Sequence, residues 1–146
     1  MSFPDILELL PHRPPMLWID EVLARDADEV RCKLTICEGQ LFVREDGTVE
    51  PLTAIEWIAQ AVGALVGLFD RDRALSPRPG YLIAIPEATF FVPRLALGDE
   101  LEISAKRLWG DDNLASFEGA VHRAGELVAR AQLSVYRSAT AAKEQS

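Results

Sequence analysis

Cysteine and histidine are both scarce in this sequence of 146 residues, which contains two of each. Cys32 and Cys37 are five positions apart, an odd spacing that places them on opposite faces of a strand. On opposite faces they neither bridge each other nor share a metal ion. We therefore expect two small, buried, apolar side chains, a reducing cytoplasmic environment and no metal site.

Basic charge and long apolar runs are also lacking. Fifteen Lys and Arg residues oppose twenty-three Asp and Glu residues, and the net charge of −8 repels nucleic acid and anionic membranes. Residues 1–10 lack the basic start and the apolar stretch of a signal peptide. The most apolar window, Pro51–Phe69, is interrupted by Glu56 and Gln60, which favours a buried helix over a membrane span.

What is present fits one domain, residues 1–137, followed by a flexible tail at 138–146. The long helix is apolar nearly all round, so it must be surrounded by protein. We predict an α+β fold in which a curved antiparallel sheet wraps this helix, with 81–92 at a dimer-forming edge. The predicted elements are helices at 3–10 and 51–70, a stiff proline-rich segment at 11–15, and strands at 16–23, 29–38, 81–92, 100–109, 114–123 and 127–137.

A line of polar and small side chains runs along the long helix. Because successive helical residues turn by about 100°, its members share one side of the helix. The line predicts a groove in which another backbone or an apolar chain lies close to the helix. The alternative is that its glycines serve only tight packing, and both roles are compatible. The members are Thr53, Glu56, Gln60, Gly63, Ala64 and Gly67.

Glu56 is the ionisable residue of that line. Burying an ionised carboxylate without a partner is costly, so such a side chain responds with a raised pKa, partly offset here by the positive end of the helix dipole. Glu56 is therefore a candidate catalytic group that holds or delivers a proton near neutral pH. The alternative is a structural carboxylate bonded to a buried hydroxyl, backbone N–H or arginine.

Two histidines are available as acid–base partners for Glu56. His122 lies on the wet face of its predicted strand and is expected to be solvated. The His12-Arg13 pair is flanked by prolines that restrict its backbone, and a pre-positioned imidazole suits general acid–base catalysis. The alternative is that His12 and Arg13 only tie the N-terminal segment to the body by hydrogen bonds.

Two motifs resemble those of the β-hydroxyacyl-(acyl carrier protein) dehydratases of the FabZ type. They are LPHRPPML at 10–17 and IEWIAQA at 55–61, and the similarity extends through 81–92, 97–101 and 127–131. Within that group the chain is most similar to the ApeP-like proteins associated with aryl-polyene pigment synthesis. The resemblance implies a hot-dog fold and dehydration of a β-hydroxyacyl thioester on acyl carrier protein, without a cofactor, in fatty-acid, polyene or polyketide-like synthesis.

The sequence departs from that family at two points. In the dehydratases, a histidine in a Gly-His-Phe motif works with the helix carboxylate of the neighbouring subunit. Glu56 matches the carboxylate, but EGQLFV at 38–43 has no histidine, and His12 is the candidate replacement. The family's glycine five residues before the carboxylate is matched by Pro51, which has no N–H to polarise a thioester carbonyl. The candidate substrate-binding residues are Leu52 and Thr53, as alternative amide donors, with Arg13, Gln60, Gly63 and Gly67.

Three functions stay open at this stage. One is dehydration with Glu56 and His12 in catalysis, the second is a partner-dependent subunit that binds an acyl chain, and the third is an acyl thioesterase. The expected partners are an acyl carrier protein or another acyl thioester, and a second hot-dog subunit, identical or different. An acidic carrier protein needs basic residues to dock on. The candidates are Arg71, Arg73, Arg78 and Arg94. The alternative is that each of these arginines is simply a solvated surface residue.

Overall fold

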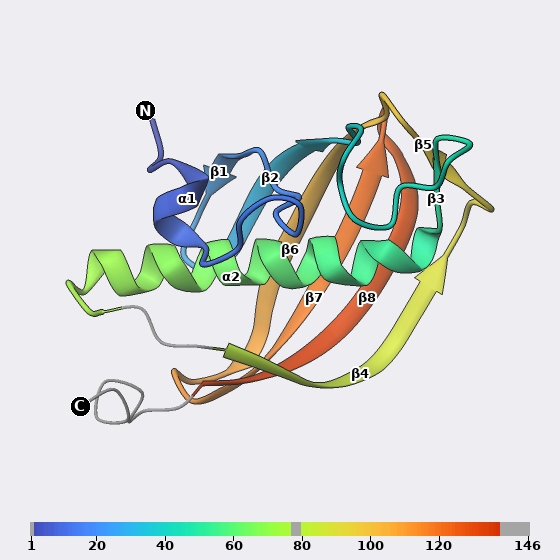
Figure 1. Ribbon diagram of the computed structural model, residues 1–146. Helices are drawn as coiled ribbons and strands as arrows, with labels where there is room; N and C mark the ends of the chain where they lie inside the picture. The colour runs from blue at the N-terminus through green and yellow to red at the C-terminus, as the bar shows by residue number, and fades with distance from the viewer. Residues whose placement is uncertain (1, 77–79, 138–146) are drawn as a thin grey trace.

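A six-stranded antiparallel sheet curves around one long helix, α2, in the computed structural model, which describes residues 2–76 and 80–137. The order across the sheet is β1-β2-β6-β7-β8-β4, and β3 pairs with β5 in a separate two-stranded sheet (Figure 1). This arrangement confirms the predicted α+β architecture. The elements are α1 (Ile6–Leu9), β1 (Glu21–Arg25), β2 (Glu29–Thr35), β3 (Thr48–Val49), η1 (Pro51–Thr53), α2 (Ala54–Asp72), β4 (Gly80–Phe90), β5 (Leu95–Ala96), β6 (Glu100–Gly110), β7 (Leu114–Arg123) and β8 (Glu126–Arg137).

The N-terminal third departs most from the predicted elements. The strand predicted at 16–23 begins only at Glu21, because the N–H groups of Trp18 and Ile19 bond to the side chain of Gln60 instead of to a neighbouring strand. The helix predicted at 3–10 shortens to α1, which starts with Asp5 as its N-cap. The small β3–β5 sheet was not predicted. The predicted tail at 138–146 lies outside the described residues.

Helix α2 fills the concave side of the sheet. Its largest fully buried side chains, Trp57, Ile58 and Leu65, pack in the main core. Although α2 is long and apolar enough to cross a membrane by length and composition alone, half of its most apolar window is buried inside the protein. The prediction that protein surrounds it on all sides is wrong for the single chain, since Ile55, Ala59 and Val66 are only partly buried.

The strand β4 lies at one edge of the sheet, where 81–92 was predicted to form an edge. It pairs with β8 on one side only, and its side chains are exposed on both faces along most of its length. Tyr81, Leu82, Ile83 and Ile85 are among these exposed apolar side chains. An unpaired, apolar edge strand is a surface that proteins normally cover.

The two cysteines have different environments. Cys32 is fully buried in β2, and burial raises the pKa of its thiol to about 12. The prediction of burial is wrong for Cys37, which is exposed just beyond the end of β2. The two cysteines are therefore separated, as the odd spacing predicted, but Cys37 is exposed to solvent.

A buried ion pair joins the C-terminal ends of α2 and β8. Arg137 Nη2 donates to Asp70 Oδ2 at 2.6 Å, with both side chains almost completely buried. Removing one partner of such a pair leaves an uncompensated buried charge, so the pair fixes where these two elements end relative to each other.

The sheet approaches α2 closely at Gly119 of β7. A Cβ atom at this position would overlap Ile58 Cγ2, so only a hydrogen atom fits there. We expect Gly119→Ala to lower the free energy of unfolding by about 1–3 kcal/mol through overpacking, measured by urea denaturation. Gly80→Ala is the matched control, because its Cβ would lie 3.5 Å from Val135 Cγ1, in ordinary contact. Equal losses in the two variants would contradict the packing argument.

Candidate active site

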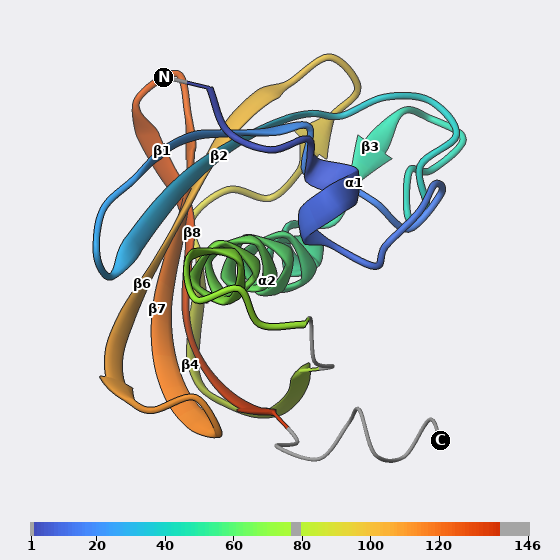
Figure 2. The ribbon, with the colours of Figure 1, turned by 90° about the vertical axis from the view of Figure 1, so that its left-hand side faces the viewer.

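Glu56 lies in the first turn of α2, where its side chain lies against His12 of the N-terminal segment and is partly exposed. Figure 2 looks along the helix and shows the sheet on one side of α2 and α1 on another. The side chain of Glu56 is 34% exposed, so the predicted deep burial is wrong for the single chain. Among residues 2–76 and 80–137, no lysine or arginine forms an ion pair with Glu56. The carboxylate is thus available for chemistry.

His12 is brought next to Glu56 by the segment that follows α1. Its Nε2 atom lies 3.7 Å from Glu56 Oε1, and its Nδ1 atom is buried without a hydrogen-bond partner among the described residues. Arg13 donates to the carbonyl oxygens of Leu7, Leu10 and His12, which satisfies the end of α1. The structure therefore brings together two residues that are 44 positions apart in sequence, and their role as an acid–base pair stays a prediction.

Gln60 connects this pair to the rest of the N-terminal segment. It is 1% exposed, and its Nε2 donates to Glu56 Oε1 at 2.9 Å and to the carbonyl oxygen of Met16 at 2.8 Å. Its Oε1 accepts from the N–H groups of Trp18 and Ile19. Sequence reasoning missed these backbone partners. The spacing of four between Glu56 and Gln60 indicates only their own contact on the helix, and no signal in the sequence points to the backbone of Met16, Trp18 or Ile19.

The two glycines of the predicted groove lie against the N-terminal segment. A Cβ atom on Gly63 would come within 2.9 Å of Leu10 Cδ2, and one on Gly67 within 2.9 Å of the carbonyl oxygen of Leu9. The close approach predicted for this line of residues is therefore made by the chain itself. The role of these glycines in substrate binding stays a prediction.

The first turn before α2 places the remaining candidates. Leu52 is largely exposed, and Thr53 is half-buried. The N–H of Thr53 already donates to the carbonyl oxygen of Glu50 at 3.0 Å, so this amide is engaged within the chain. Of the two amides predicted to replace the family's glycine, Leu52 is therefore the better candidate.

The segment that would carry the family's histidine carries apolar side chains instead. Gln40 folds back, and its Oε1 accepts from the N–H of Cys37 at 2.7 Å. Leu41 and Phe42 are exposed, and Phe42 has a positive φ of 70°, which is uncommon for a bulky residue. The segment has no imidazole, and its one titratable side chain is the carboxylate of Glu38.

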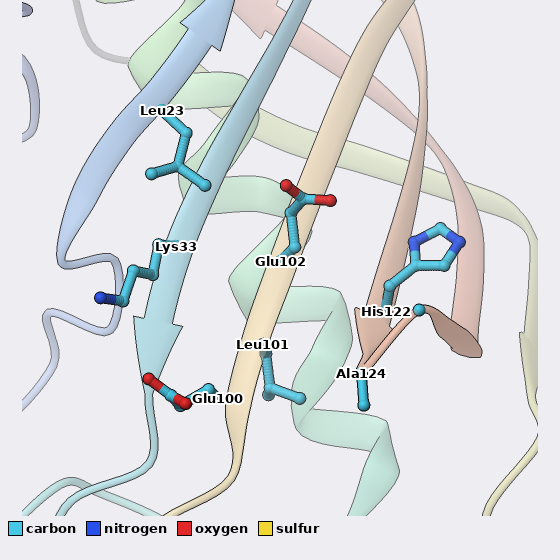
Figure 3. A pocket seen from close by; sticks show the side chains of 8 residues that line it. Leu23, Lys33, Glu100, Leu101, Glu102, His122 and Ala124 are labelled. Atoms are coloured by element: carbon cyan, nitrogen blue, oxygen red, sulfur yellow. The ribbon is translucent and has the colours of Figure 1, made fainter.

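A hollow of about 370 Å³ lies on the face of the sheet away from α2. Figure 3 shows Lys33, Glu102 and His122 side by side on β2, β6 and β7, with α2 behind the sheet. His122 is half-buried there and belongs to a different face from Glu56, which agrees with its exclusion as an acid–base partner. Within the described residues, no group of three or more His, Cys, Asp or Glu side chains is placed to hold a metal ion.

The basic residues considered for carrier docking are paired with acidic side chains. Arg73 makes two hydrogen bonds to the carboxylate of Asp112, and Arg94 lies 3.5 Å from Glu50. Arg71 lies 3.9 Å from Glu8, and Arg78 is outside the described residues. These pairs reduce the positive charge that each arginine offers to an acidic partner.

Comparison with known proteins places these features in a family. A family model described as ApeP-like, ApeP dehydratase, matches residues 4–145. The 3-hydroxyacyl-(acyl-carrier-protein) dehydratase FabZ of Yersinia pestis is 30% identical over 148 residues, covering 97% of this chain and 82% of that protein. A structure of the dehydratase heterocomplex ApeI:P from Xenorhabdus doucetiae matches with a TM-score of 0.89 at 26% identity, covering 99% of this chain and 98% of that one.

More distant structures share the fold alone. Zebrafish thioesterase superfamily member 2 matches with a TM-score of 0.61 at 18% identity, over 80% of this chain and 79% of that one. The likeness confirms that the sheet wrapped around α2 is the hot-dog fold that the sequence resemblance implied.

Proposed function

The chain belongs to the ApeP-like dehydratase family, and from this premise we propose that it supplies the carboxylate of a dehydratase acting on a β-hydroxyacyl thioester bound to acyl carrier protein. The observation that carries the proposal is that the carboxylate of Glu56 is partly exposed, lies next to His12, and forms no ion pair with a lysine or arginine of the described residues. We include the acyl carrier protein in the proposal because the name of the related FabZ enzymes states that their substrates are bound to it.

Dehydration requires two proton-transfer groups. A base removes the proton from the α-carbon, the bond between the β-carbon and its hydroxyl oxygen breaks, and an acid protonates the departing hydroxyl so that water leaves and a C=C bond forms. Glu56 is one of these groups. The second is a histidine, either His12 of the same chain or a histidine of another subunit.

We infer that the second group comes from a different hot-dog subunit. The segment 38–43 has no histidine, so two copies of this chain would leave both sites without the imidazole that the family uses there. The edge of β4 is unpaired and apolar, and the similar ApeI:P structure is a heterocomplex. A partner that extends the sheet at β4 would cover this edge and approach the open side of α2.

The acyl chain has a path on that open side. Ile55, Ala59 and Val66 form a partly buried apolar strip that starts beside Glu56 and runs along α2. The line containing Gly63 and Gly67 is already covered by Leu9 and Leu10. We therefore assign the acyl chain to the strip formed by Ile55, Ala59 and Val66, where the partner subunit would cover it. We do not assign it to the line that contains Gly63 and Gly67.

The carboxylate is tested by Glu56→Gln, which keeps the shape of the side chain and removes its ability to titrate. We expect dehydration of a β-hydroxyacyl carrier thioester to fall by about 10²- to 10⁴-fold, read by intact mass as the loss of one water. The assay uses this chain alone and co-purified with a hot-dog chain that carries the Gly-His-Phe motif.

The control is Glu118→Gln on the outer face of β7, which should keep full activity. A Glu56→Gln variant as active as the parent would refute the carboxylate's role. Activity of the chain alone would assign the second group to His12, and release of free thiol would indicate a thioesterase instead.

The role of β4 in binding a partner is tested by introducing charged side chains on this edge strand. Ile83→Lys combined with Ile85→Lys places two ammonium groups on β4, and we expect the heterocomplex to dissociate in size-exclusion chromatography with light scattering. Leu23→Lys is the control, because Leu23 is similarly exposed but lies on β1. A complex that survives the β4 substitutions unchanged would show that the partner binds elsewhere.

A further inference from the structure

We propose that the complex of this chain with its partner has one working site, because the segment 38–43 closes the other site and Phe42 fills it. The inference rests on the function proposed above, in which Glu56 meets an imidazole from a different hot-dog subunit. That pair is the first site. The second site is its counterpart, where the segment 38–43 of this chain faces the long helix of the partner.

The second site follows from the way two chains of one fold pair. In an interface with two-fold symmetry, every contact from one subunit is matched by the reciprocal contact from the other. Two hot-dog chains that join along β4 follow this rule in their backbones even when their sequences differ. If the partner's histidine segment reaches Glu56, the segment 38–43 of this chain therefore reaches the carboxylate on the partner's long helix.

The side chains of the segment 38–43 cannot complete that second site. Gln40 is engaged within the segment, where its Oε1 accepts from the N–H of Cys37 at 2.7 Å. Leu41 and Phe42 are hydrocarbons that neither donate nor accept a proton. Glu38 is titratable, but it would only add a like charge to the partner's carboxylate. The second site therefore has no acid–base pair.

The backbone of the segment presents Phe42 outward. Its φ of 70° lies in the left-handed region that bulky residues rarely adopt, and the residue is 56% exposed. Hydrogen bonds hold the chain on both sides of it, from Leu41 N to Pro15 O at 3.3 Å and from Arg44 N to Thr48 O at 2.9 Å. An uncommon conformation that is held on both sides and exposes an aromatic ring points to a contact outside the single chain.

The contact that suits Phe42 is the mouth of an acyl path. In this chain the proposed path is the apolar strip of Ile55, Ala59 and Val66 beside Glu56. A partner of the same fold has the equivalent path beside its own helix carboxylate. A phenyl ring placed there buries its apolar surface and takes up the space of the substrate. The second site is then filled in addition to lacking an imidazole.

The number of working sites is tested by removing one carboxylate at a time. Glutamine replaces Glu56 in one complex and the partner's helix carboxylate in another, and dehydration is read by intact mass. We expect Glu56→Gln to lower kcat by about 10²- to 10⁴-fold. The partner substitution should keep the parent kcat, because no imidazole faces that carboxylate. Two equal sites would instead lose half of the activity with each substitution.

The role of Phe42 is tested by counting bound carriers. Native mass spectrometry of the Glu56→Gln complex with excess β-hydroxyacyl carrier thioester should show one carrier per pair of chains. Adding Phe42→Asn removes the ring and keeps the positive φ, which asparagine tolerates, so we expect two carriers. The matched control is Trp109→Asn on β6, since Trp109 is also 56% exposed, and it should leave the number at one.

The outcomes separate this inference from the proposed function. If each carboxylate substitution halves the activity, or if two carriers bind while Phe42 is present, the one-site inference is wrong and the role of Glu56 stands. A single carrier on the Phe42→Asn complex would show that Phe42 does not fill the second site. If the Glu56→Gln complex is as active as the parent, the proposed function fails, and the inference that rests on it fails too.

Discussion

An apolar helix whose sides must each be covered is the constraint on which this structure depends. The curved sheet covers one side of α2, where Gly119 lets the backbone approach Ile58 closely. The N-terminal segment covers a second side, where Gly63 and Gly67 admit Leu10 and Leu9. The third side, with Ile55, Ala59 and Val66, stays partly open in the single chain. The exposed β4 lies at the edge of the same sheet, and the partner proposed above would cover both surfaces.

The position of Glu56 follows from this division of the helix surface. It lies between the covered side and the open side, so its Oε1 is held within the chain while part of the side chain remains exposed. Its neighbours are the neutral amide of Gln60, which donates to Oε1, and the imidazole of His12 at 3.7 Å.

The candidate site was predictable only in part. Glu56 and His12 were singled out by type and surroundings, and the fold brings them within 3.7 Å. The outward position of Cys37 and the exposure of Glu56 were not predicted, because periodicity shows which residues share a face and not which faces the rest of the chain covers. The backbone bonds of Gln60 were missed for a related reason: they form across more than forty residues of sequence.

The sequence alone determined the long helix, most strands of the six-stranded sheet and the candidate carboxylate, because hydrophobic period, turn residues and the spacing from Glu56 to Gln60 are local properties of the chain. It also determined that no histidine lies at 38–43. Only the tertiary structure decided which sides of α2 are covered, that His12 faces Glu56, and that one edge of β4 has no partner strand among the described residues. These features depend on contacts between distant segments, whose geometry is set by how the sheet closes around the helix.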